Sequence, residues 1–379
     1  MKKRSLHKIQ EAVSLLGFGT MRYPMLGEEI DRESLRAMFD LAMEQGVNYY
    51  DTAYVYHGGL SECMVGELLV DRYPRESFFL ADKMPGWKLP KEATAADMMA
   101  IFHEQQQRLH TDYIDFYLIH SLDQEAWQTL LDQGVLDFIR QLREGGQVGH
   151  IGFSFHDQPE QLKPILSAVD WDFAQIQMNY YDWQGEQNAE EQYRILTEAG
   201  LPVIVMEPIR GGALAELPAE GQKHLAEVGF QSGAEAALRW VASHENVLTV
   251  LSGMSSLEQM AENCSLFRDF RPLSAAEAEG IEKALAVLNA HEFLPCTGCR
   301  YCCEECPQGI EISKALKARN EYTSFQNKAA LDNYQRLVKP GHHPKDCRFC
   351  GACARVCPQG INVPEEMVKL ADLLQRELG

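Results

Sequence analysis

The chain has 379 residues, of which 45% are hydrophobic and 24% charged, and its formal net charge is -20. This length supplies enough apolar material for one large core and a second, smaller domain. The acidic balance argues against a nucleic-acid-binding surface and favours a protein partner that carries a basic patch.

The cysteines and the apolar runs indicate the compartment. No apolar run approaches the length of a membrane span, and the N-terminal segment lacks the small-residue cleavage site of a secretory signal. Nine of the 11 cysteines lie between Cys296 and Cys357, a clustering typical of metal ligands and not of scattered disulfides. Because thiolate ligands need reducing conditions, we expect a cytoplasmic protein without a membrane partner.

Eight short β-rich runs alternate with helical patterns in the first part of the chain. The predicted strands are residues 15–19, 47–51, 77–83, 113–119, 149–154, 173–178, 201–206 and 247–252. Alternation of this kind predicts a parallel sheet, and eight units over about 250 residues predict an α/β fold of the closed (β/α)8 TIM-barrel type. An open, doubly wound sheet is the alternative, but no G-x-G-x-x-G follows the first predicted strand.

Four polar side chains lie at or after the ends of successive predicted strands: Asp51 ends the second, Tyr56 lies on the following loop, Lys83 ends the third and His120 follows the fourth. The carboxyl ends of barrel strands meet on the face that carries active sites. A nearby ammonium would lower the phenol pKa of about 10, and a histidine could orient a carbonyl oxygen. This set predicts a proton relay for carbonyl reduction.

Five stretches within residues 12–290 resemble the aldo-keto reductases: LGFGTMR, DTAYVYHGGLSE, LADKMP, YIDFYLIHSLD and GMSSLEQMAEN. The resemblance implies an NAD(P)H-dependent oxidoreductase that transfers hydride between NADP(H) or NAD(H) and a small carbonyl or alcohol substrate. It implies Tyr56 as general acid, Lys83 and Asp51 as its tuning pair, and His120 as the substrate-orienting residue. The implied cofactor contacts are Gly19, Thr20, Met21, Asp51, Ser154, Gln175, Met206, Ser252, Gly253, Gln259, Glu262 and Asn263.

The later part of this region departs from the family pattern. Met206 stands where many members have a tyrosine that stacks on the nicotinamide, and Ser154, Phe155 and His156 replace the usual serine-asparagine pair. No lysine or arginine lies near Ser255 to hold a 2'-phosphate. The choice between NADP and NAD therefore stays open.

Two C-x2-C-x2-C-x3-C-P runs close the chain, with the spacing of bacterial proteins that hold two 4Fe-4S clusters. In that pattern the fourth cysteine of each run binds the other cluster, which predicts one set of Cys296, Cys299, Cys302 and Cys357 and another of Cys347, Cys350, Cys353 and Cys306. Structural zinc sites are the alternative. Cys303 is predicted to be a bystander.

The whole arrangement resembles a subgroup of aldo-keto reductases with a C-terminal ferredoxin-like domain. We expect a barrel over residues 1–290, whose last helix opens with a capping box at Ser274 and Glu277, and an iron-sulfur domain over 291–379. The intervening segment 311–340 and the C-terminal segment are predicted to be helical.

Two functions fit these features. In the first, the barrel reduces a carbonyl or oxidises an alcohol, and the clusters are structural or exchange electrons with a one-electron partner protein. Nicotinamide exchanges two electrons at once, whereas a 4Fe-4S centre exchanges one. Direct electron transfer between them would therefore need a cofactor that can exchange either one or two electrons, such as a flavin. In the second, the chain is an electron-transfer or redox-sensing protein whose barrel binds nucleotide without efficient carbonyl turnover.

Overall fold

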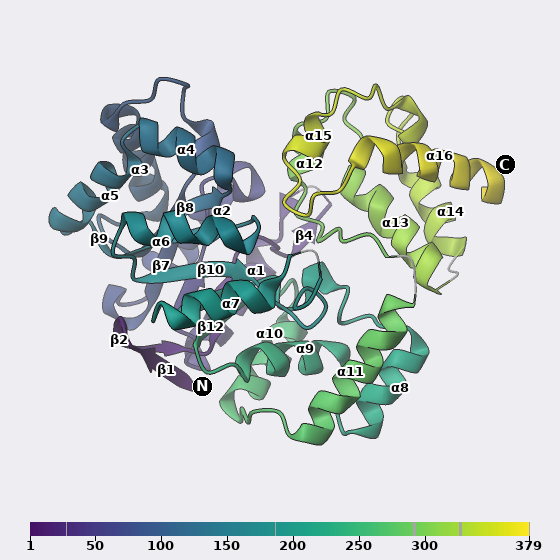
Figure 1. Cartoon of the computed structure of the whole chain (residues 1–379), viewed down its shortest axis with the longest axis horizontal. Helices are drawn as coiled ribbons and strands as arrows, with labels where there is room; N and C mark the ends of the chain where they lie inside the picture. The colour runs from purple at the N-terminus through teal and green to yellow at the C-terminus, as the bar shows by residue number, and fades with distance from the viewer. Residues whose placement is uncertain (28, 186, 291–292, 326–327, 379) are drawn as a thin grey trace. The chain divides into compact units, whose positions relative to one another are not determined.

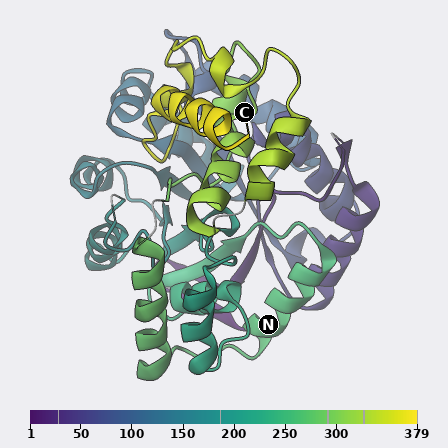
Figure 2. The same cartoon turned by 90° about the vertical axis from the view of Figure 1, so that its right-hand side faces the viewer.

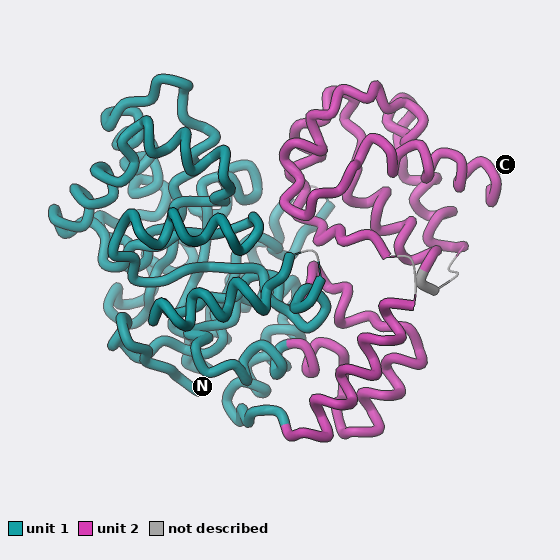
Figure 3. Tube along the Cα trace, viewed as in Figure 1, with its two compact units in different colours: residues 1–208, 238–273 teal, residues 209–237, 274–379 magenta. Residues whose placement is uncertain are grey.

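The computed structural model describes residues 1–27, 29–185, 187–290, 293–325 and 328–378. The chain divides into two compact units: unit 1 comprises Met1–Pro208 and Leu238–Leu273, and unit 2 comprises Ile209–Ala237 and Ser274–Gly379 (Figure 3). The predicted boundary at 290/291 stays a prediction, and residues 291 and 292, where the second domain was predicted to begin, lie outside the described residues.

Unit 1 contains a closed barrel of eight strands (Figure 1). All neighbours pair in parallel, and the pairing of the last strand with the first closes the ring. The strands, in order, are β3 (Leu16–Gly19), β6 (Tyr49–Asp51), β7 (Phe79–Met84), β8 (Ile114–Leu122), β9 (Val148–Phe155), β10 (Phe173–Gln177), β11 (Val203–Met206) and β12 (Val247–Ser252). Each matches one predicted run, so the TIM-barrel prediction is confirmed and the open sheet is wrong.

An N-terminal hairpin, which the sequence analysis did not predict, covers one end of the barrel. Its strands are β1 (Lys3–Leu6) and β2 (Ile9–Ser14), paired antiparallel. Ile9 and Val13 are fully buried against residues near the strand starts, such as Tyr49 and Leu248. Because the hairpin packs at the amino ends of the strands, the carboxyl ends form the opposite face. A second antiparallel ribbon, β4 (Met25–Leu26) with β5 (Glu29–Ile30), follows β3.

Helices connect the barrel strands, and several begin at a side-chain cap. Asp31 accepts a hydrogen bond from the Ser34 amide, and Thr94 and Asp97 form a capping box. The helices of unit 1 are α1 (Arg32–Glu44), α2 (Leu60–Val65), α3 (Ala95–Leu109), α4 (Gln124–Asp132), α5 (Val135–Glu144), α6 (Leu162–Ala168), α7 (Ala189–Glu198) and α10 (Leu257–Arg268), and α9 (Gly233–Ala242) spans both units. None of the helices in the described ranges is long and apolar enough to cross a membrane.

Unit 2 is helical. The helices α8 (Ala219–Glu227) and α11 (Ala275–Asn289) lie side by side (Figure 2), and the predicted capping box of Ser274 and Glu277 opens α11. They are followed by α12 (Tyr301–Glu304), α13 (Ile312–Phe325), α14 (Lys328–Leu337), α15 (Ala352–Arg355) and α16 (Val363–Leu378).

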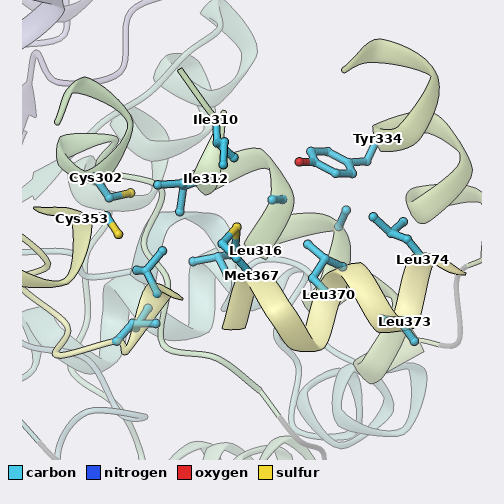
Figure 4. Packing of buried hydrophobic residues seen from close by; sticks show 14 of the residues in the cluster. Cys302, Ile310, Ile312, Leu316, Tyr334, Cys353, Met367, Leu370, Leu373 and Leu374 are labelled. Atoms are coloured by element: carbon cyan, nitrogen blue, oxygen red, sulfur yellow. The ribbon is translucent and has the colours of Figure 1, made fainter. Parts of the chain in front are cut away.

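A compact apolar core joins the helices that follow residue 300. Leu316, Met367 and Leu370 pack together with Cys302 and Cys353 in one buried cluster (Figure 4). The helices α13 and α14 confirm the helical prediction for 311–340 in the described part of that segment, and α16 confirms the amphipathic C-terminal helix.

Candidate functional site

The structure brings the four predicted catalytic side chains together at the carboxyl ends of β6, β7 and β8. Lys83 Nζ donates to Asp51 Oδ1 at 2.7 Å and to the Thr52 carbonyl oxygen at 2.6 Å, and it lies 3.3 Å from the Tyr56 hydroxyl. The rings of Tyr56 and His120 meet edge to face with their centroids 6.0 Å apart. All four residues are buried, so their charges act in a medium of low polarity.

The sequence analysis predicted that His120 follows its strand, but His120 lies within the strand. The strand β8 continues to Leu122, and its register shifts between Ile119 and Leu122. Ser121 adopts a left-handed conformation with φ 59° at this irregularity. The strand therefore bends directly beside the imidazole, and a prediction from apolar pattern alone placed its end too early.

The pKa of Tyr56 moves in the direction opposite to the predicted one. Burial raises the pKa of this phenol well above its ordinary value and the charge of Asp51 adds to the rise, while Arg22 acts against it. The cost of taking a phenolate out of water exceeds the stabilisation by nearby cations. Tyr56 is therefore protonated at neutral pH and can donate its O–H.

The carboxyl and imidazole groups beside Tyr56 are also shifted. Burial raises the pKa of Asp51, although the charge of Lys83 and its hydrogen bond lower it. Burial lowers the pKa of His120 well below its usual value, with Lys83 and His156 adding to the effect. Burial lowers the pKa of His156 to about 4. Both imidazoles are neutral at pH 7, and neither Nδ1 has a hydrogen-bond partner among the described residues.

The predicted cofactor contacts near β3 and β12 lie at the same face. Gly19 ends β3, Met21 is half-buried, and Thr20 Oγ1 donates to the Asp51 carbonyl oxygen at 2.8 Å. The other contacts of this group lie at the end of β12 and on α10: Ser252 Oγ accepts from Asn263 Nδ2 at 3.1 Å, Gln259 Oε1 accepts from the Ser255 amide at 2.8 Å, and Glu262 is exposed. These side chains form internal contacts within unit 1.

The contacts predicted beside the nicotinamide carboxamide differ in their readiness to bind a ligand. Ser154 Oγ accepts from the Ser121 amide at 2.7 Å, so this hydroxyl already has a partner. Gln175 Nε2 lies 3.7 Å from Met206 Sδ, whereas Gln175 Oε1 is buried and unpartnered among the described residues. A buried amide oxygen without a donor is costly unless a ligand or water supplies one. Gln175 therefore fits an amide-bearing cofactor.

In unit 2, a small hollow lies beside the second cysteine run. Its lining includes four of the predicted ligands: Cys306, Cys347, Cys350 and Cys353. Cys306 belongs to the first run, so the structure places the fourth cysteine of one run with the first three of the other.

Three of the four cysteines of the other predicted set, Cys296, Cys299 and Cys302, lie near one another. The hydrogen bond with Cys303, burial, and the charges of Cys303, Cys299 and Cys296 raise the pKa of the Cys302 thiol, which places these sulfurs near one another. Across the described residues, no group of three or more His, Cys, Asp or Glu could hold a single metal ion.

Comparisons with known proteins match two parts of the chain to two families. Residues 15–286 match the Aldo/keto reductase family, and residues 295–361 match the 4Fe-4S dicluster domain. The chain belongs to the aldo/keto reductase family. It is an oxidoreductase of this family that carries a C-terminal iron-sulfur domain.

Several relatives of this aldo/keto reductase have been described. It is 26% identical to the Bacillus subtilis protein named "Uncharacterized oxidoreductase YqkF" over 77% of this chain and 96% of the relative, and 24% identical to the Escherichia coli "NADH-specific methylglyoxal reductase" over 69% and 92%. The holo form of aldo-keto reductase AKR11C1 from Bacillus halodurans superposes with a TM-score of 0.63 at 29% identity, covering 75% of this chain and 96% of that one. A Klebsiella pneumoniae aldo/keto reductase in complex with NADP and acetate shares the fold, with a TM-score of 0.60 at 22% identity over 75% and 95%.

Two polar groups at the barrel face of this aldo/keto reductase were missed by the sequence analysis. Behind Lys83, Gln105 Nε2 donates to Asp82 Oδ2 at 2.7 Å and to the Lys83 carbonyl oxygen at 3.0 Å. Arg22 Nη2 donates to Glu207 Oε1 at 2.7 Å, which joins the segment after β3 to the residue after β11. Asp82, directly before Lys83 in an otherwise apolar strand, is a signal that could have revealed the first group.

Proposed function

We propose that this aldo/keto reductase transfers hydride between NADP(H) or NAD(H) and a small carbonyl or alcohol substrate, with Tyr56 as the general acid and base. The observation that supports this most is the buried chain from Asp51 through Lys83 to Tyr56, with separations of 2.7 and 3.3 Å. A structural ion pair would not require a phenol at its end. The bound nicotinamide supplies the hydride; the protein supplies the proton.

Each of the four side chains has a role in this proposal. Tyr56 donates its O–H to the substrate oxygen during reduction, and the ammonium of Lys83 stabilises the phenolate that remains. Asp51 pairs with the buried Lys83 at 2.7 Å and holds its Nζ beside Tyr56. His120, which is neutral, orients the substrate oxygen by a hydrogen bond beside Tyr56. In alcohol oxidation the same groups act in reverse.

The cofactor contacts and the compartment complete the proposal. In this proposal Gln175 and Ser154 contact the carboxamide, and Gly19, Thr20 and Met21 contact the nicotinamide. The stretch from Gly253 to Asn263 contains no lysine or arginine, so both NADPH and NADH are used in the test below. The iron-sulfur domain is proposed to hold two 4Fe-4S clusters in the crossed pattern that the hollow beside Cys306 supports, which requires a reducing compartment such as the cytoplasm. No flavin is included, because neither matched family is described as binding one.

The test compares Tyr56→Phe with Tyr54→Phe in the iron-loaded protein, using each nicotinamide and a panel of carbonyl compounds under anaerobic conditions. Tyr54 is a matched control because its hydroxyl donates to Glu104 at 2.7 Å and not to Lys83. We expect Tyr56→Phe to lower kcat by about 10² to 10⁴-fold with unchanged nucleotide binding, and Tyr54→Phe to stay near the parent. Full turnover by Tyr56→Phe would refute the role of Tyr56.

A second candidate is supported by the altered carboxamide contacts. Since Ser154 Oγ is occupied by the Ser121 amide and Met206 replaces an aromatic ring, the barrel could bind nucleotide in a redox-sensing protein. Nucleotide binding without turnover of any carbonyl in the panel would favour this candidate over the first.

A further inference from the structure

One segment of unit 2 is basic although the whole chain is strongly acidic. Residues 336–355 carry five lysines and arginines and a single aspartate, a net charge of +4 with neutral histidines, against -20 for the whole chain. The five cations are all exposed: Arg336, Lys339, Lys345, Arg348 and Arg355. The charge is therefore presented to solvent.

These cations are not neutralised by neighbouring carboxylates. Lys345 and Arg348 form no ion pair with any described residue. The single acid of the segment, Asp346, accepts a hydrogen bond from the His343 amide at 2.9 Å and caps the turn in which it lies. Elsewhere in unit 2 the pattern is the opposite: Arg300 lies 3.1 Å from Glu311.

Two of these cations lie at the second predicted cluster site. Arg348 lines the same hollow as Cys350, and Arg355 Nη1 lies 3.5 Å from the Cys350 carbonyl oxygen. Cys350 is exposed, whereas the other seven predicted ligands, all within the described ranges, are buried or half-buried. Beside it, Phe349 is 60% exposed and adopts a left-handed conformation with φ 54°. A predicted ligand of this site thus reaches the surface between positive charges and an aromatic ring.

We propose that this surface, formed by Lys345, Arg348 and Arg355 around Phe349 and Cys350 and called here the Cys350 surface, docks a small acidic one-electron carrier protein. Complementary charge steers and orients such encounters, and aromatic and arginine side chains are typical of interface centres. In the step that docking serves, the reduced carrier loses one electron and the oxidised centre held by the cysteines gains it; no bond breaks and no proton moves.

This inference rests on the proposed iron-sulfur ligation and revises the expected partner charge. The net charge of the chain predicted a partner with a basic patch, but electrostatic interactions are screened beyond about 8–10 Å at physiological salt. The charges near the exposed ligand therefore decide which carrier is attracted, and these are positive.

The test measures binding of an acidic plant-type 2Fe-2S ferredoxin, used as the probe, to the oxidised, iron-loaded full chain by titration calorimetry. The variant is Lys345→Gln/Arg348→Gln/Arg355→Gln, and the control is Lys314→Gln/Lys317→Gln/Lys369→Gln, which removes three exposed cations that lie near Glu311, Glu321 and Glu365. We expect the variant to raise Kd by at least about 10-fold at low ionic strength and to weaken the salt dependence, while the control changes Kd by less than about 2-fold.

A second measurement separates docking from cluster assembly. The photoreduced ferredoxin and the methyl viologen radical, a small cation, are each mixed with the oxidised protein, and bleaching of the visible absorbance is followed. If the Cys350-surface variant is bleached more slowly by ferredoxin but not by methyl viologen, docking is supported. If the variant and the control have equal Kd values and equal rates of bleaching by ferredoxin, the docking proposal is overturned. Binding of anionic vesicles or duplex DNA through these residues, without ferredoxin binding, also overturns it. A protein without iron or without bleaching by viologen refutes the proposed ligation, and docking with it.

Discussion

Gly211 lies directly against Thr297 in unit 2: a Cβ atom added to Gly211 would lie 2.1 Å from the Thr297 carbonyl oxygen. Gly211 also has φ 63°, a conformation that L-residues rarely adopt. Thr297 follows Cys296, the first predicted ligand, and the Arg210 guanidinium lies over the Phe293 ring at 5.6 Å. The turn at Arg210–Gly212 therefore fixes the segment that leads into the first cysteine run.

Gly211→Ala is expected to displace this segment and to weaken retention of the cluster bound by Cys296. The side chain cannot be accommodated without movement of the Thr297 backbone. The rate of iron loss to a chelator, followed by visible absorbance, should rise several-fold. Gly212→Ala is the matched control, since Gly212 also has positive φ but no atom within 4 Å of an added Cβ. Equal rates in the two variants would show that backbone strain alone, and not the contact with Thr297, is responsible.

A double-mutant cycle should show that the buried Lys83 and Asp51 are energetically coupled. Lys83→Met leaves an uncompensated carboxylate and Asp51→Asn an uncompensated ammonium, so each single variant should lose about 3–5 kcal/mol of unfolding free energy. The double variant should be more stable than the sum of the two losses predicts. Urea unfolding followed by tryptophan fluorescence measures unit 1 selectively, because all five tryptophans lie there: Trp87, Trp127, Trp171, Trp183 and Trp240. Additive losses would contradict direct coupling.

The barrel was predictable because its parallel strands are buried and appear as apolar runs between helical patterns. The positions of Asp51, Tyr56 and Lys83 followed from the same alternation, since strand ends converge. The sequence could not show how burial shifts a pKa, so the predicted direction of the Tyr56 pKa shift was wrong. It also could not show the Arg22–Glu207 pair, whose members are 185 residues apart in the chain, or the unpaired cations around Cys350.

Unit 1 should lose stability in acid through its neutral histidines. The pKa of His156 is lowered from 6.5 to about 4 and that of His120 is lowered as well, so the folded state binds fewer protons than the unfolded state below pH 6.5. The stabilising contribution is present above pH 6.5 and is lost as the pH falls toward 4. His156→Gln should reduce the slope of unfolding free energy against pH by up to about 1.4 kcal/mol per unit in this window. The exposed His103 provides the control His103→Gln, and an unchanged slope in His156→Gln would contradict the assignment.

The crossed ligation can be decided by iron analysis of paired substitutions. Cys306→Ser should lower the iron content from about eight to about four atoms per chain, whereas Cys303→Ser should leave it unchanged, because Cys303 Sγ instead accepts from the Ser313 amide at 3.5 Å. Cys306→Ser/Cys350→Ser removes two ligands of the same predicted cluster and should retain about four atoms. Cys306→Ser/Cys299→Ser removes one ligand from each and should retain almost none. If each run instead held its own cluster, the two double variants would exchange results, since Cys306 and Cys299 would then belong together.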